Sequence, residues 1–239
     1  MILRTEKLFK KYKHRMVVNG ISISVRQGEI VGLLGPNGAG KTTIFYMTVG
    51  LVNPYDGSVY LGDKEVTDWS MYQRSRAGIS YLDQETSIFR GLSIEDNLMA
   101  VAQMLTVSKS EQQEKVDSLL EDFGLIRLRK QMSVTLSGGE KRRLEIARAL
   151  VTNPKFLLLD EPFVGIDPIT VDDIQKIIKS LRDRGLGILI TDHNVRETLE
   201  IIDRAYIIYE GKILLEGSAK KLLENPKAKK VYLGDNFKM

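Results

Sequence analysis

The sequence predicts an α/β fold with a mixed central sheet, organised around one phosphate-binding loop. Three short apolar runs read as buried strands, at residues 30–34, 156–159 and 187–191. Segments with helical spacing of apolar residues lie between them. The first run leads into a glycine-rich loop and then into helix-forming residues, which is the context that a phosphate site needs.

The glycine-rich loop at residues 35–42 fills every fixed position of the motif G-x-x-x-x-G-K-[ST]. Glycines let the backbone approach phosphate closely, and the N–H groups of a helix N-terminus attract the anion. Lys41 is expected to reach the β- and γ-phosphates, and Thr42 to place its hydroxyl on Mg²⁺. The alternative is a glycine-rich turn that binds nothing. The expected binding residues are Gly35, Pro36, Asn37, Gly38, Ala39, Gly40, Lys41, Thr42 and Thr43.

Composition restricts the class of protein. The chain has 239 residues, of which 43% are hydrophobic and 28% charged, as in soluble globular proteins. No apolar run approaches the ~20 residues that span a bilayer, and no signal segment opens the chain, so we expect a cytoplasmic protein. Cysteine is absent, which excludes thiol chemistry, and a net charge of +4 is too small to indicate a nucleic-acid partner.

Three further motifs follow in order: L-S-G-G-E at 136–140, L-L-L-D-E at 157–161 and T-D-H at 191–193. With the phosphate loop, they make the chain resemble the nucleotide-binding subunit of an ABC transporter over nearly its whole length. The resemblance implies the ABC ATPase fold. That fold has a P-loop NTPase core with a mixed sheet, an N-terminal antiparallel β subdomain and an inserted α-helical subdomain.

The chain is therefore expected to form one domain over residues 1–239. Residues of about 1–84 and 153–239 would make the RecA-like core with its β subdomain, and about 85–152 the helical subdomain. The elements expected in order are paired strands in 1–30, a turn at 53–57, strands at 58–61 and 79–82, helices at 94–105, around 116–123 and from 136 to about 151, a helix at 170–184, a hairpin of 204–209 with 212–216, and a basic terminal helix.

The strand ends carry the expected catalytic groups. Asp160 would hold Mg²⁺, and Glu161 would polarise a water for in-line attack; the alternative is an acidic turn at a strand end. The resemblance implies that Gln84 binds Mg²⁺ and the attacking water, and that His193 senses the γ-phosphate. Relatives more often carry proline before this glutamine, where this chain has Asp83.

A second phosphate-binding end is expected at the start of the third helix, because a helix N-terminus attracts anions. Since the chain has its own phosphate loop, this end makes most sense across a homodimer interface; its residues are Ser137, Gly138, Gly139 and Glu140. The resemblance also implies that Asp167 lies in a loop that contacts the opposite subunit. It further implies that Tyr12 stacks on adenine; the alternative is a surface tyrosine between lysines.

The resemblance implies an ATP hydrolase in which two copies clamp two ATP molecules and drive separate membrane subunits. A soluble ABC ATPase that acts on ribosomes or DNA is an alternative, but such proteins usually carry two cassettes or long coiled-coil insertions. A nucleotide-binding regulator without hydrolysis would more often lack Glu161 or His193, and both are present.

Within transporters, residues 87–93, 185–199 and 232–237 closely resemble the lipopolysaccharide-export ATPases of Gram-negative bacteria. This implies two inner-membrane subunits as partners, lipopolysaccharide as the indirect cargo, and a place on the cytoplasmic face of the inner membrane. A branched-chain amino acid importer is the alternative.

Phe89 and Arg90 are expected to contact the membrane subunits; alternatively, Phe89 packs under the helical subdomain. Lysines near the end of the chain indicate a solvated helix face or, alternatively, contact with anionic lipid. They are Lys220, Lys221, Lys227, Lys229 and Lys230.

Overall fold

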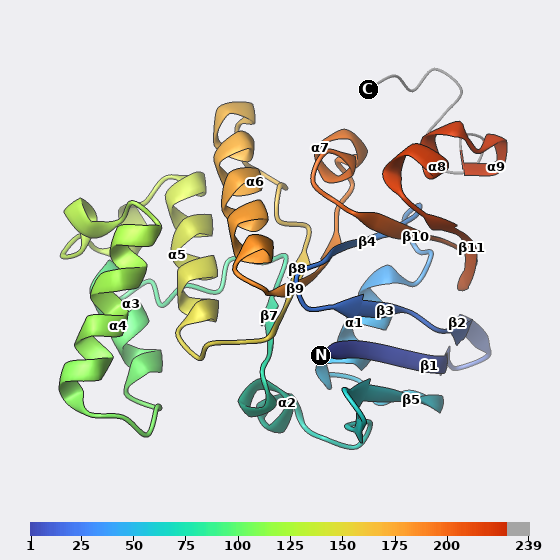
Figure 1. The fold of residues 1–239 in the computed structure, drawn as a ribbon, viewed down its shortest axis with the longest axis horizontal. Helices are drawn as coiled ribbons and strands as arrows, with labels where there is room; N and C mark the ends of the chain where they lie inside the picture. Colours follow the sequence, from blue (N-terminus) through green and yellow to red (C-terminus); the bar gives the residue numbers. More distant parts are fainter. Residues whose placement is uncertain (229–239) are drawn as a thin grey trace.

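The computed structural model describes residues 1–228, so Lys229, Lys230 and the tail at 232–237 lie outside the described residues. A six-stranded sheet has the order β11-β10-β4-β9-β8-β7, and β11 pairs antiparallel with an otherwise parallel set (Figure 1). The predicted mixed sheet is therefore confirmed. Its strands are β4 (Ile30–Leu34), β7 (Ile79–Leu82), β8 (Phe156–Asp160), β9 (Gly187–Thr191), β10 (Arg204–Tyr209) and β11 (Lys212–Gly217).

A second, antiparallel sheet contains the N-terminal strands. Its order is β2-β1-β5-β6, and β3 also pairs with β1. Pairing of Phe9 with Asp56 draws Asp56 and Gly57 into β5, so the predicted turn at 53–57 is too long. The strands are β1 (Ile2–Tyr12), β2 (Arg15–Ile21), β3 (Ser24–Arg26), β5 (Asp56–Leu61) and β6 (Lys64–Glu65).

The helices are α1 (Lys41–Val49), α2 (Met71–Ala77), α3 (Ile94–Ala102), α4 (Lys109–Asp122), α5 (Gly138–Leu150), α6 (Pro168–Asp183), α7 (Val195–Leu199), α8 (Ala219–Glu224) and α9 (Pro226–Ala228). The sequence analysis did not predict α2 or α7, because neither is long enough to show periodicity. α3 ends at Ala102, three residues earlier than predicted. Beyond it, the N–H groups of Met104 and Leu105 donate to the carbonyls three residues before them, as in a 3₁₀ turn. Within residues 1–228, no helix is both long and apolar enough to cross a bilayer.

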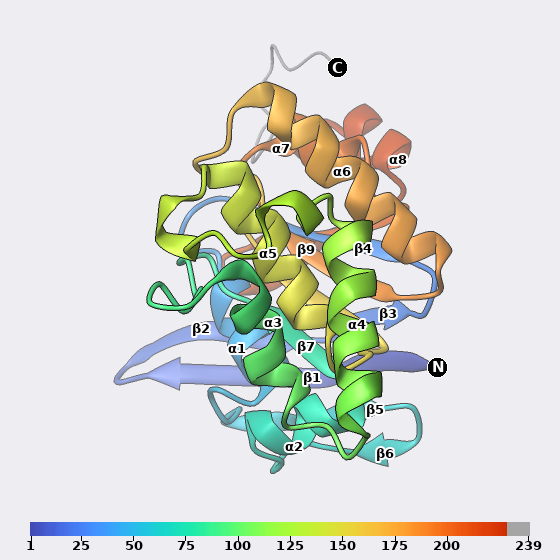
Figure 2. The same cartoon turned by 90° about the vertical axis from the view of Figure 1, so that its left-hand side faces the viewer.

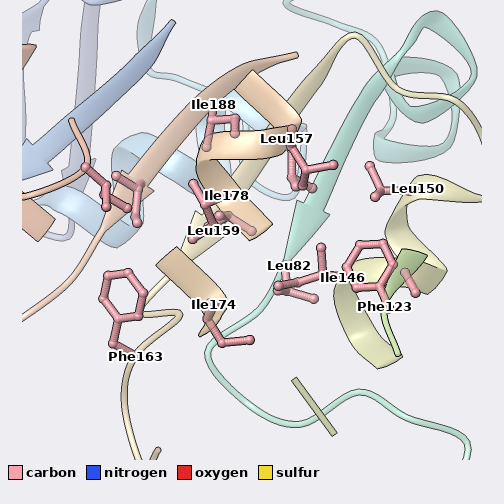
Figure 3. Packing of buried hydrophobic residues seen from close by; sticks show 14 of the residues in the cluster. Leu82, Phe123, Ile146, Leu150, Leu157, Leu159, Phe163, Ile174, Ile178 and Ile188 are labelled. Carbon is pink, nitrogen blue, oxygen red and sulfur yellow. The ribbon is translucent and has the colours of Figure 1, made fainter. Parts of the chain in front are cut away.

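Apolar residues alternate between two cores along the central strands. Leu157 and Leu159 of β8 face one cluster, which includes residues of α5 and α6 (Figure 3). Phe156 and Leu158 face the other, which joins α1 to both sheets. Since both faces are covered, β8 is buried throughout and reads as a continuous apolar run.

α3 and α4 stand beside the sheets rather than on them, and α5 lies between these two helices and α6 (Figures 1 and 2). A buried carboxylate forms ion pairs that connect α3 to the segment after α4. Glu95 of α3 is 7% exposed and pairs with Arg129 and Lys130. Hydrogen bonds from these two cations lower the pKa of Glu95 from 4.5 to about 2.

Replacing Glu95 with Gln is expected to lower the free energy of unfolding by about 1–2 kcal/mol at neutral pH, after allowance for the exposure of Lys130. The carboxylate stabilises the fold while it is ionised in both states. The difference from wild type should therefore shrink as pH falls from about 4.5 towards 2. Urea unfolding across this pH range measures it. Glu121→Gln, on the exposed surface of α4, is the matched control. Equal stabilities of wild type and Glu95→Gln at neutral pH would show that the pair contributes nothing.

Candidate functional site

Four loops meet at the carboxyl edge of the parallel strands, because those strands point the same way. They follow β4, β7, β8 and β9 and surround a cavity of about 320 Å³. This cavity brings part of the phosphate loop together with three polar residues that lie far away in the sequence. Its lining residues are Val17, Asn37, Gly38, Gly40, Lys41, Thr42, Thr43, Gln84, Glu161 and His193.

The phosphate loop packs closely against two strands, β10 and β2. A Cβ atom at Gly35 would lie 2.1 Å from the Ile208 carbonyl oxygen, and φ at Gly35 is +148°. At Gly40, with φ of +106°, a Cβ atom would lie 2.7 Å from the Val17 carbonyl oxygen. Only glycine fits both the conformation and the space at these two positions.

Lys41 folds back into the concave side of this loop. Its Nζ donates to the carbonyl oxygens of Gly35 at 2.7 Å and Pro36 at 3.1 Å. Burial lowers the pKa of Lys41, while the charges of Glu161 and Asp160 oppose that change. The ammonium group thus lies where a phosphate enclosed by the loop would meet it.

Asp160, at the end of β8, is 2% exposed and accepts hydrogen bonds on both oxygens. Thr191 Oγ1 donates to Oδ1, and Tyr81 donates to Oδ2 at 3.5 Å. Burial raises the pKa of Asp160, and the charges of Glu161 and Asp83 add to that increase. The sequence analysis gave neither Thr191 nor Tyr81 a role, since only strand pairing places them here.

Glu161 adopts a left-handed backbone conformation with φ of +47°, which is unusual for a residue other than glycine. Its N–H donates to the Thr191 carbonyl at 2.9 Å. One carboxylate oxygen accepts from Gln84 Nε2 at 2.7 Å, and the other lies 2.5 Å from His193 Nε2. Glu161 therefore contacts both of the other predicted catalytic side chains, and this arrangement is able to orient a water and accept its proton.

The signature residues, which are Ser137, Gly138, Gly139 and Glu140, do not line the cavity at the phosphate loop of their own chain. Gly138 lines a separate cavity of about 200 Å³, together with Gln84 and Glu161. Ser137 and Glu140 form a capping box at the start of α5. A Cβ atom at Gly139 would lie 2.1 Å from Thr170 Cγ2, so this glycine lets α5 approach α6.

Among the other predicted residues, six do not line the 320 Å³ cavity: Gly35, Pro36, Ala39, Asp160, Asp167 and Tyr12. Asp167 caps α6 by accepting from the Thr170 N–H at 3.0 Å. Tyr12 is 46% exposed at the end of β1, and Lys10 Nζ lies 5.5 Å from its ring centroid. Their expected contacts, with a second chain and with adenine, stay predictions.

Two buried charged residues connect the site loops, and the sequence analysis gave them no role. Arg142 of α5 donates to the carbonyls of Asp160 and Asp83, at 3.2 and 3.1 Å. Asp192 accepts from the N–H groups of Phe163 and Asn194, at 3.0 and 2.7 Å. In the sequence, Arg142 stands in a Lys-Arg-Arg run, where nothing local distinguishes it from its neighbours.

The oxygen donors of the site fit Mg²⁺ bound together with phosphate. They are the Thr42 hydroxyl, the Asp160 carboxylate and the Gln84 amide oxygen. Mg²⁺ usually takes one or two protein carboxylates plus substrate phosphates. In the described residues, no group of three or more His, Asp or Glu side chains forms a metal cage. The donor set therefore suits a metal that arrives with a nucleotide.

Comparison with known proteins gives one consistent result. The family model described as ABC transporter matches residues 18–164. The lipopolysaccharide export system ATP-binding protein LptB of Acidithiobacillus ferridurans is 52% identical over 238 residues, covering 100% of this chain and 99% of the relative. The protein of the same name from Escherichia coli strain K12 is 53% identical over 238 residues, covering 99% of each chain. A solved ATP-binding cassette of an ABC transporter has a TM-score of 0.89 and 31% identity, covering 98% of this chain and 99% of that one.

Proposed function

Because this chain belongs to the ABC transporter family as an ATP-hydrolysing subunit, we propose that it drives the export of lipopolysaccharide from the inner membrane. The observation that carries the proposal is identity of 52% and 53%, over the full chain, to two relatives named lipopolysaccharide export system ATP-binding proteins. The protein would act as a peripheral subunit on the cytoplasmic face of that membrane. The alternative function is that of a branched-chain amino acid importer. Since the two functions differ in cargo, measuring which molecule is transported distinguishes them.

In the proposed reaction, Glu161 accepts a proton from water while the water oxygen bonds to the γ-phosphorus of ATP. The bond from that phosphorus to the β–γ bridging oxygen breaks, which yields ADP and phosphate. Gln84 and His193 each contact one oxygen of the Glu161 carboxylate and so fix its orientation. When bound, Mg²⁺ would neutralise charge on the β- and γ-phosphates, held by Thr42, Asp160 and Gln84. Lys41 would contact the same phosphates.

The site is proposed to be completed by a second copy of the chain. The signature helix end lies away from its own phosphate loop, so the Ser137–Glu140 segment of a partner would close over the γ-phosphate. Apolar side chains around this end are unusually open. Ile169 is 81% exposed, Val134 53% and Val164 47%. A second subunit would remove these side chains from water.

Contact with the membrane subunits is proposed to centre on the loop around Phe89 and Arg90. Phe89 is 47% exposed, whereas the neighbouring Ile88 is 7% exposed, so burial of Phe89 as a core residue is not observed. The backbone N–H of Phe89 donates to Asn97 Oδ1 at 2.8 Å, and Ser133 Oγ donates to its carbonyl at 2.9 Å. The loop is thus anchored while the ring stays open to a partner.

Arg148 extends this surface. Its guanidinium carbon lies 4.7 Å from the Phe89 ring centroid, and its Nη1 is buried with no hydrogen-bond partner among residues 1–228. It also lines one of two adjoining cavities, of about 150 and 260 Å³, which share Ser75, Val101 and Thr152. A short helix from a membrane subunit, with an acidic side chain or free carbonyls at its end, suits this surface.

Phe89→Ala is expected to abolish lipopolysaccharide export while leaving the isolated subunit folded and active. An exposed interface anchor contributes to binding and little to the core. The experiment reconstitutes the subunit with its membrane partners in proteoliposomes and measures ATP-dependent release of lipopolysaccharide. Co-purification with the membrane subunits and the melting curve of the isolated subunit are measured in parallel. Tyr55→Ala removes an aromatic ring that is 72% exposed in the bend just before β5, and is the matched control.

A Phe89→Ala subunit that has a lower melting temperature but still assembles and exports lipopolysaccharide would contradict the coupling role. ATP-dependent transport of branched-chain amino acids, with no release of lipopolysaccharide by the wild-type complex, would reject the cargo itself.

A further inference from the structure

The hydroxyl of Tyr81 occupies a place that the reaction described above does not use. Tyr81 lies in β7, and its hydroxyl is 3.5 Å from Oδ2 of Asp160. The other carboxylate oxygen, Oδ1, accepts from Thr191 Oγ1. Each oxygen of the buried carboxylate thus has its own hydroxyl donor, and two donors on different oxygens restrict rotation of the group.

A second aromatic ring holds Tyr81 in place. The ring of Tyr46 in α1 meets it edge to face, with centroids 6.3 Å apart and an interplanar angle of 90°. Such pairs stabilise one relative orientation of the rings. Tyr46 stands four residues after Thr42, so both lie on the same side of α1. The ring contact therefore joins the helix that presents the Thr42 hydroxyl to the strand that lies beside Asp160.

The strand register adds a second carboxylate nearby. β7 and β8 pair in parallel with Leu82 opposite Leu159, and Asp83 directly follows the last residue of β7. A phenol with its ordinary pKa of about 10 carries its proton at neutral pH, so the Tyr81 hydroxyl is available as a donor.

We propose that Tyr81 is a positioning residue that orients the Asp160 carboxylate for Mg²⁺, with Tyr46 fixing its ring. This inference rests on the proposed nucleotide site, but not on the cargo. Residues that hold a metal ligand from outside typically change metal affinity or activity 10–100-fold when they are altered.

The test is Tyr81→Phe, which removes the hydroxyl and keeps the ring contact with Tyr46. Binding of a fluorescent ATP analogue to the full chain is titrated with Mg²⁺, and separately in EDTA. The Mg²⁺ concentration for half-maximal binding should rise about 10-fold, while binding in EDTA stays unchanged. Tyr72→Phe removes an exposed hydroxyl from α2, and its Mg²⁺ response should match wild type.

A Tyr81→Phe response within about twofold of wild type would overturn the proposal. Equal weakening with and without Mg²⁺ would also overturn it, since that result marks a general packing defect. Because the readout is binding by the isolated chain, failure of lipopolysaccharide export would leave this result unaffected.

Discussion

Replacing Glu161 with Gln is expected to lower ATP turnover by about 10²–10⁴-fold while leaving ATP binding intact, since a general base contributes that much to the rate. Glutamine keeps the size of the side chain and an oxygen for the bond from Gln84, but it does not accept a proton. The bound ATP is then not consumed, so the two subunits should stay together. Phosphate release measures the rate, and gel filtration with ATP measures the dimer.

Glu121→Gln makes the same chemical change on the exposed face of α4 and should hydrolyse ATP like wild type. The left-handed backbone at residue 161 is no less accessible to Gln than to Glu, so a folding defect is not expected. Near-normal phosphate release by Glu161→Gln would remove this carboxylate from its proposed role.

Mixing two inactive variants is expected to restore hydrolysis. Lys41→Ala damages the phosphate loop and leaves the signature intact, whereas Ser137→Arg does the reverse. A mixed dimer combines the intact loop of one chain with the intact signature of the other, so one of its two sites is complete. With random pairing, half of the dimers are mixed, and about one quarter of the wild-type sites should form. ATPase rates across mixing ratios measure the recovery.

The control for this experiment uses a matching helix start. Ser137 caps α5 with Glu140, and Ser108 caps α4 with Glu111, each through a capping box. Ser108→Arg therefore loses the same cap, worth about 1 kcal/mol, and gains the same bulk away from the site. It should keep full activity alone. If Ser137→Arg alone is also fully active, or if mixing restores nothing, the site is not shared between chains.

The sequence by itself determined most of the local elements of this protein, with α2 and α7 as exceptions. The phosphate loop follows an apolar strand and opens a helix, and each of these features depends on neighbouring residues. Buried strands such as β8 are visible because both of their faces are covered, so the apolar run is unbroken. The division into a core and a helical insert at about residues 84 and 152 stays a prediction.

Tertiary structure alone decided how these elements meet. Asp160 lies opposite Thr191 because β8 and β9 pair in one register, and no local pattern states that register. Arg142 stands in a run of basic residues, yet it is 7% exposed and donates to the carbonyls of Asp83 and Asp160 at the ends of two strands. The openness of Phe89 also depends on packing around it. Sequence periodicity reports which face of an element is buried, whereas contacts between distant residues depend on strand order and register, which are properties of the whole fold.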